Sequence, residues 1–537
     1  MKTLHIANLQ EQGFNSDVAP DFLPANAMTL IENGHFLANR LYAIGGYAAV
    51  DADDSSNVPS LFDPGHLRFI NASAGSYWVI AGCGVENGGS ADDKAIYSYD
   101  GSSFVDVSCS SAIYNNLASP NNWTSCMFNN IPVLNHPQSF PQYQPTATAT
   151  TDFVEAYWTG TTKWSTAGMS CGAIASHKNF LFAMDMSEGA TELPYVVRWS
   201  DAADPGAMPS SWDETDPTNL AGKVTLAAEG GKCLNGASLR DTFVVYRENA
   251  IHTFDFVGGQ YVFNVRTLSP SIGAAGRHSF LEHKGFHYFI SKGDIYRTDG
   301  NSLESLLSDK ARLSFLGTVN QDNINKSFVF AIPIINEIWF CVPVGSNYVN
   351  FAYIYNVDKG TFTTANITET YHVASGYPAS NPSTWADLSD SWDDMFGTWL
   401  ITSAGSVVDS AYFCTIENGS TKSKLLNLNT IGFATDIDFT TVFQRDSLRI
   451  DEADASCTVL EVFPHFNATE SIYFTIGASE TPYGAITWQP EVTVSPTQRK
   501  IDVRCTGKYF AYKFRSEGKY PWWLSGLSIK YVLDGER

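Results

Sequence analysis

The sequence is poor in charged residues and has no long apolar run. Asp, Glu, Lys and Arg make up only 17% of the 537 residues, whereas aromatic residues make up 13%. Because so many aromatic side chains cannot be left in water, extended disorder is excluded. No apolar run approaches the ~18 residues that a membrane-spanning helix requires, so we expect no membrane-spanning segment.

Paired cysteine motifs and positive charge are also scarce. The nine cysteines are dispersed, with no C-x-x-C pair and no clustering with histidine. This pattern indicates reduced, buried thiols and not a disulfide framework. The 33 Lys and Arg residues are outnumbered by 56 Asp and Glu residues, which gives a net charge of -23. Such a surface repels phosphate, which excludes a basic nucleic-acid groove but permits a wall along which DNA slides.

Helical periodicity is rare in this chain. One stretch, 301–315, predicts an amphipathic helix with Leu303, Leu306, Leu307 and Leu313 on one face. Elsewhere, short aromatic and β-branched runs end at turns rich in Gly, Asn and Asp, which indicates an all-β protein.

A strand–turn–strand unit recurs along most of the chain. It is clearest at 240–300, where it occurs twice. Further copies occupy 35–51, 76–108, 179–205, 336–367 and 397–419, with loops such as 109–170 and 368–396 between them. We predict a β-propeller-like domain of about six or seven blades over 33–429, with an irregular assembly of β-sandwiches as the alternative.

The two ends of the chain differ from this repeat. Residues 1–32 are polar and contain Pro20 and Pro24, which predicts an extended N-terminal arm that crosses onto another domain or subunit. Residues 430–537 show a cleaner alternation of apolar and polar side chains. They predict a β-sandwich or jelly-roll platform domain of about seven or eight strands.

Three patterns resemble catalytic or metal-binding motifs but lack the context that their chemistry needs. Gly168–Gly172 matches G-x-S-x-G, yet a strand follows where a nucleophile elbow needs a helix. Asp51–Asn57 begins like a calcium loop but lacks its sixth-position Gly and its terminal Glu. His283 and His287 are four residues apart and have no evident third ligand.

Two further patterns resemble carbohydrate-binding features. The acidic and aromatic loop 385–394 suits a carbohydrate platform, a subunit contact or an ordinary surface loop. Ala478–Trp488 is similar to the Asp-box turn of sialidases but lacks the Asp. We therefore predict no catalytic, cofactor-binding or metal-ligating residues, and no cofactor.

Three blocks of sequence together resemble the tail nozzle proteins of short-tailed bacteriophages, which are also called tail hub or head-to-tail stabilisation proteins. They are Asp21–Met28 (DFLPANAM), Leu234–Tyr246 leading to Ile251–Gly259, and Gly507–Arg515 with Trp523–Ile529. The chain departs from this family at Leu41–Gly46, which lacks an aromatic-Pro-Gly sequence.

The resemblance implies a structural virion protein of the phage tail, without enzymatic activity, that is assembled in the host cytoplasm. It implies a hexameric ring below the portal and its adaptor, which channels and helps to retain the genome. Double-stranded DNA would pass without sequence-specific binding, and tail fibres, spikes or a needle would dock below. Six copies at -23 each would carry -138. The arm and Tyr520–Trp523 are the expected subunit contacts.

Two alternatives from other functional classes stay open at this point. One is a propeller glycosidase or lyase that acts on host surface glycans, which would need paired carboxylates at one end of the propeller. The other is a carbohydrate-binding adhesion module.

Overall fold

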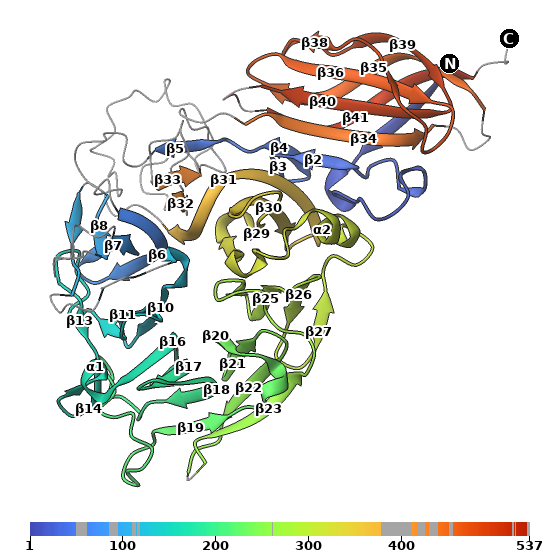
Figure 1. Ribbon diagram of the computed structural model, residues 1–537. Helices are drawn as coiled ribbons and strands as arrows, with labels where there is room; N and C mark the ends of the chain where they lie inside the picture. Colours follow the sequence, from blue (N-terminus) through green and yellow to red (C-terminus); the bar gives the residue numbers. More distant parts are fainter. Residues whose placement is uncertain are drawn as a thin grey trace.

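The computed structural model describes residues 1–49, 62–84, 95–101, 103–109, 114, 117, 119–259, 261–376, 410–415, 425–428, 439–450, 455–517, 520 and 522–533. These residues are almost entirely β, with two short α-helices, α1 (Trp164–Ala167) and α2 (Arg312–Thr318). Neither helix is long and apolar enough to cross a bilayer. Figure 1 shows a ring of small sheets with a two-layered sandwich at one side, and the first and last strands, β1 (Lys2–Ala7) and β41 (Trp522–Leu533), both lie in the sandwich. The predicted fold class, propeller-like domain plus β-sandwich, is confirmed.

Six blades follow one another along the chain, each with four antiparallel strands. Blade 1 contains β6 (Phe62–Ala72), β7 (Gly75–Gly84), β8 (Ile96–Tyr99) and β9 (Phe104–Asp106); blade 2, β10 (Thr124–Phe128), β11 (Ile131–Asn135), β12 (Gln142–Tyr143) and β13 (Val154–Glu155); and blade 3, β16 (Met169–His177), β17 (Phe180–Glu188), β18 (Thr191–Trp199) and β19 (Gly222–Thr225). Blade 4 contains β20 (Cys233–Leu239), β21 (Thr242–Arg247), β22 (Ile251–Phe256) and β23 (Phe263–Ser269); blade 5, β24 (Phe280–His283), β25 (Phe286–Ile290), β26 (Ile295–Thr298) and β27 (Leu303–Ser305); and blade 6, β28 (Phe328–Ile332), β29 (Glu337–Val342), β30 (Val349–Asn356) and the first half of β31 (Thr361–Gly376). A small hairpin, β14 (Tyr157–Thr159) and β15 (Thr162–Lys163), follows blade 2.

The seventh blade closes the ring. From Thr370 onward, β31 leaves β30 and pairs with β32 (Ser410–Thr415), which pairs in turn with β33 (Leu425–Leu428). The last strand is β5 (Tyr47–Ala49), which comes from before blade 1 and pairs with β33. Blade 7 therefore combines chain from both sides of the repeat, and β31 contacts β6 of blade 1.

Two expectations for this domain are wrong. Residues 109–170 contain blade 2 and are not a loop; its strands β12 and β13 have two residues each, and Asn135 and Gln142 are buried, so the aromatic pattern is missing. The stretch 301–315 is not one helix, because it contains β27 and only the start of α2. Leu306 and Leu307 are both buried whereas Leu313 is exposed, so these leucines do not share a face.

The sandwich combines both ends of the chain. One sheet has the order β3–β4–β41–β35–β39, with β1 also paired to β41, and the other runs β2–β34–β40–β36 with β37 and β38 on β36. The strands are β1 (Lys2–Ala7), β2 (Leu30–Glu32), β3 (Gly34–Leu37), β4 (Arg40–Ala43), β34 (Thr441–Arg449), β35 (Cys457–Ala468), β36 (Ile472–Ser479), β37 (Thr487–Trp488), β38 (Val492–Val494), β39 (Ile501–Gly507), β40 (Tyr509–Ser516) and β41 (Trp522–Leu533). The propeller-like domain is thus an insertion in the sandwich.

The N-terminal arm folds onto its own chain. β1 pairs along β41, the carbonyl of Leu23 accepts a hydrogen bond from Arg445 Nη2 at 3.0 Å, and Met28 is fully buried. The expected boundary between residues 32 and 33 therefore falls inside the sandwich. The hairpin expected at 35–51 is also divided, because β3 and β4 belong to the sandwich and β5 belongs to blade 7. A Cβ at Gly34 would lie 2.5 Å from Phe443 Cε1, so only glycine permits this entry into the sandwich.

Asn33 holds the two domains together. It is buried with a left-handed backbone (φ 55°), a conformation that Asn tolerates better than most residues. Its N–H donates to Thr364 O at 2.9 Å, and its carbonyl accepts from Ile44 N at 2.9 Å. Its side-chain Nδ2 donates to Thr440 O and its Oδ1 accepts from Asn366 N, both at 2.8 Å. Thr364 and Asn366 lie on β31, and Ile44 and Thr440 lie at the two chain crossings, where the chain passes between the sandwich and the propeller-like domain.

Replacing Asn33 with Ala is expected to lower the free energy of unfolding by about 3 kcal/mol, since two backbone groups lose their partner and Ala disfavours a positive φ. Thermal unfolding and protease sensitivity of the domain junction would measure the loss. Asn39→Ala is the matched control, because Asn39 also has a positive φ (61°) but is exposed. It should cost only about 1 kcal/mol. Equal losses in the two variants would contradict the role of Asn33.

All nine cysteines are buried thiols that form no disulfide, as predicted. Burial raises the pKa of the Cys83, Cys126 and Cys233 thiols to about 12 and that of Cys505 to about 11.

Because the thiolate is the reactive form, the folded protein should not react with Ellman's reagent at pH 8, and all nine thiols should react after denaturation. Rapid reaction of the native protein would contradict this arrangement.

Candidate functional site at the propeller axis

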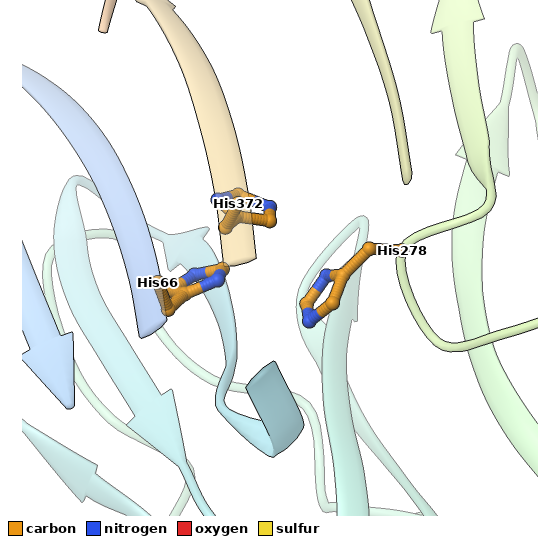
Figure 2. A group of neighbouring side chains, drawn as sticks. All are labelled: His66, His278 and His372. Carbon is orange, nitrogen blue, oxygen red and sulfur yellow. The ribbon is translucent and has the colours of Figure 1, made fainter. Parts of the chain in front are cut away.

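A cavity of about 510 Å³ lies at the centre of the propeller-like domain. Its walls come from the first strands of blades 1, 2, 4, 5 and 6 and from the second half of β31. Figure 2 shows three histidines that face one another there: His66 from β6, His278 from the segment before β24, and His372 from β31. Each comes from a different part of the ring, so the closed propeller creates the cluster.

Local backbone irregularities lie next to two of these histidines, His66 and His372. The β6–β7 register shifts between Pro64 and His66, and the β31–β32 register shifts between Thr370 and His372. Such bulges redirect a side chain relative to the regular pleat. At Gly65 a Cβ would lie 2.1 Å from the backbone of Pro120, so glycine lets the neighbouring loop approach β6.

The three imidazole rings are in mutual contact. Ring centroids lie 4.4 Å apart for His66 and His372, 4.7 Å for His278 and His372, and 5.2 Å for His66 and His278. One nitrogen from each ring lies within 4.8 Å of the other two.

Hydrogen bonds fix which nitrogens stay available. His278 Nε2 lies 3.1 Å from Asn121 O, a carbonyl that only accepts, so Nε2 carries the proton and Nδ1 keeps its lone pair. His66 Nε2 lies 2.8 Å from Ser125 Oγ, and its buried Nδ1 has no hydrogen-bond partner among the described residues. His372 Nδ1 accepts the N–H of Leu67 at 3.2 Å.

All three histidines are held neutral near pH 7. Burial and the neighbouring imidazoles place the pKa of His66 well below its usual value, and burial, His278 and Arg68 do the same to the pKa of His372. Burial and Arg277 lower the pKa of His278 to about 4. Neutral imidazole is the form that binds metal ions.

Two arginines adjoin the histidines and make the cavity more positive. Arg277 pairs with Asp185 at 2.9 Å and also donates to Gly172 O. Arg68 is half-buried, donates to Ser125 O at 3.4 Å, and has its pKa lowered by burial. Among the described lining residues, Glu282 is the one carboxylate. The described part of the cavity wall therefore offers neutral imidazoles and cations but no carboxylate pair of the kind that glycosidases use.

The motifs considered from the sequence do not contribute to the three-histidine cluster, although His283 lines the same cavity. Gly168–Gly172 runs from α1 into β16. As predicted, it therefore lacks the strand before and the helix after that a nucleophile elbow needs. His283 and His287 lie on adjacent strands with separate partners: His283 Nε2 contacts Asn336 Oδ1 at 2.8 Å, and His287 Nε2 donates to Ser238 O at 2.9 Å. Neither belongs to the three-histidine cluster.

The remaining sequence patterns give no site either. Ala478–Trp488 spans the end of β36 and all of β37 in the sandwich. Trp522 is buried in the sandwich core, Trp523 stacks under Arg40 at 4.2 Å, and Tyr520 is exposed. The segments 51–57 and 385–394 lie outside the described residues.

The three-histidine cluster is missed by sequence reasoning. His66, His278 and His372 are far apart in the chain, and no spacing pattern connects them. Only the ring closure that places blades 1, 5 and 7 around one axis brings them together, so no local signal was available to find them.

No protein-family model matches the chain, and no curated protein matches it significantly. Solved structures do match, at low similarity. YCF48 bound to a D1 peptide shares 10% identity over 73% of this chain and 99% of its own, with a TM-score of 0.34. The exo-β-1,3-galactanase of Phanerochaete chrysosporium with galactose shares 10% identity over 91% of this chain and 100% of its own, with a TM-score of 0.23. A glycoside hydrolase shares 11% identity over 89% of this chain and 99% of its own, with a TM-score of 0.24.

These matches correct one expectation. The prediction that the chain has no enzymatic activity is contradicted, because two of the similar structures are glycoside hydrolases. We drop that prediction, and the low TM-scores assign no reaction in its place.

The buried histidines predict acid sensitivity. Burial also lowers the pKa of His177, His252 and His287 to about 4, so six histidines bind fewer protons when folded than when unfolded. The histidines therefore contribute their full share to the free energy of unfolding above about pH 6.5. This contribution is lost as the pH falls toward 4, by up to about 1.4 kcal/mol per pH unit for each histidine. Unfolding measured between pH 7 and 4.5 should show this slope, and stability independent of pH there would contradict it.

Proposed function

We propose that this protein is a subunit of the tail nozzle of a short-tailed bacteriophage. It would form a ring below the portal and its adaptor and channel the genome. Tail fibres, spikes or a needle would dock to the opposite side of the ring. This role places the protein in the virion, after assembly in the host cytoplasm.

The observation that carries this proposal is where the three resembling blocks lie in the fold. Asp21–Met28 packs against the sandwich, and Leu234–Tyr246 and Ile251–Gly259 lie mostly on β20 to β22 of blade 4. Gly507–Arg515 and Trp523–Ile529 lie mostly on β40 and β41. Tyr512 on β40 places its hydroxyl 3.8 Å from the sulfur of Met28, so the first and last blocks meet. The resemblance therefore falls on residues that build the architecture and not on scattered surface positions.

The connection between the domains also suits a wall under load. The chain crosses between sandwich and propeller twice, and β2 adds a parallel bridge to β31 at Glu32 and Thr364. One hydrophobic core continues across this junction, from Phe443 and Phe514 in the sandwich to Tyr353 and Phe362 in blade 6. A force applied to one domain is therefore transmitted through covalent and packed contacts to the other.

The charge of the chain is consistent with the passage of DNA. A ring of acidic subunits repels phosphates, so a duplex inside it would move without being trapped. The sandwich presents exposed apolar side chains that suit contacts between subunits, among them Phe22 in the arm and Tyr520 next to β41.

The glycosidase alternative lacks support at the axial cavity. A carboxylate pair roughly 5–9.5 Å apart is needed for that chemistry. Among the described residues that line the cavity, Glu282 is the one carboxylate.

The proposal is tested by assembling the full-length chain with its portal–adaptor complex. Negative-stain images and native mass spectrometry should show a six-fold ring attached to the adaptor, because the sandwich surfaces bind neighbouring copies. A chain that stays monomeric and does not bind the adaptor would overturn the proposal.

Two matched variants locate the contact. Phe22→Asp should abolish or weaken ring formation, whereas Tyr261→Asp, at the tip of the β22–β23 hairpin, should leave it intact. Phe22 and Tyr261 are similarly exposed, at 79% and 78%, so both variants should keep the thermal stability of the parent protein. If only Tyr261→Asp prevented assembly, the sandwich would not be the subunit interface.

A further inference from the structure

The three axial histidines have the composition of a transition-metal site. Zinc binds imidazole nitrogen at ~2.0–2.1 Å, commonly with three protein ligands and one open position. His66, His278 and His372 each offer a nitrogen, and these nitrogens lie within 4.8 Å of one another. Small rotations of the side chains toward a common centre would bring all three to bonding distance.

Two of the three rings each offer a nitrogen with a lone pair. The buried His66 Nδ1 has no hydrogen-bond partner among the described residues, although the side chain is only 4% exposed. His278 Nδ1 keeps its lone pair because Nε2 donates to Asn121 O. A backbone carbonyl in this position is the usual outer partner of a metal-bound histidine, since it fixes the ring orientation.

The third ligand requires one local change. His372 Nδ1 accepts the N–H of Leu67. A metal ion that binds Nδ1 displaces this hydrogen bond, and one that binds Nε2 requires the ring proton to move to Nδ1, which breaks the same hydrogen bond. The neighbouring Arg68 and Arg277 also disfavour a cation. Both effects weaken the site without removing its ligands.

The donor set selects the class of metal. Imidazole suits zinc, copper, nickel and iron, whereas magnesium and calcium need oxygen ligands. We propose that His66, His278 and His372 bind one divalent transition-metal ion, with zinc as the expected occupant, at the axis of the propeller. The ion joins blades 1, 5 and 7 and faces the cavity with its open position.

This inference does not depend on the nozzle proposal, because it concerns the isolated chain. Its test uses the full-length protein without a histidine tag, stripped with a chelator and dialysed. Titration with zinc sulfate, followed by calorimetry, should show one ion bound per chain. Zinc should also raise the thermal unfolding temperature, because an ion that binds only the folded state stabilises it. Cobalt(II) should give the visible absorption of a four-coordinate site.

Variants separate this site from adventitious binding. His278→Gln should weaken zinc binding at least ~100-fold. His465→Gln should bind like the parent, since His465 is exposed in the sandwich. Arg68→Gln should bind zinc more tightly, by roughly tenfold, since it removes a nearby positive charge. A merely structural histidine cluster would not produce this gain.

The outcomes that overturn the proposal are equally clear. They are no zinc binding below 1 mM by the parent protein, or binding by His278→Gln that equals the parent. If His278→Gln fails to fold by circular dichroism, His66→Asn and the Arg68→Gln gain decide the question in its place. If zinc binding were lost in His465→Gln alone, the ion would bind at the surface, which would contradict an axial site.

Discussion

The structure depends on a buried asparagine held in a left-handed conformation. Asn33 satisfies backbone groups at Ile44, Thr364, Asn366 and Thr440, which belong to the two chain crossings and to β31. A buried backbone donor or acceptor without a partner is costly, so these four contacts fix the position of one domain on the other. Gly34 follows at once and admits the ring of Phe443, which continues the sandwich core to the junction.

Because this junction is fixed, the propeller can be an insertion whose two ends start close together. Residues just beyond the first crossing, Tyr47–Ala49, complete the last blade by pairing with Leu426–Leu428. Hydrogen bonds of one β-strand thus close the ring, and they also tie its closure to the sandwich. The polar blade 2 is stabilised differently: Tyr114 donates to Gln142 Oε1 at 2.5 Å, and Asn135 Nδ2 donates to Cys171 O at 2.9 Å.

Ring closure has a chemical consequence at the axis. The cavity wall combines the first strands of blades 1, 2, 4, 5 and 6 with the second half of β31, so inward side chains from different blades meet at the axis. His66, His278 and His372 meet in this way, and burial together with the neighbouring imidazoles and arginines lowers their pKa values and keeps them neutral. Three neutral imidazoles with fixed outer partners form a more specific chemical environment than the rest of the cavity wall.

The sequence by itself determined the β character, the repeated blades, a C-terminal sandwich of about seven or eight strands and the buried thiols, because each depends on local alternation and composition. It did not reveal blade 2, because buried amides such as Gln142 and Gln144 replace its apolar pattern. It also placed the domain boundary wrongly, since β3 and β4 carry the same alternation in either domain. Only the tertiary structure decided the insertion of the propeller, the closure through Tyr47–Ala49 and the axial histidines. All three rest on contacts between residues hundreds of positions apart, which local periodicity does not record.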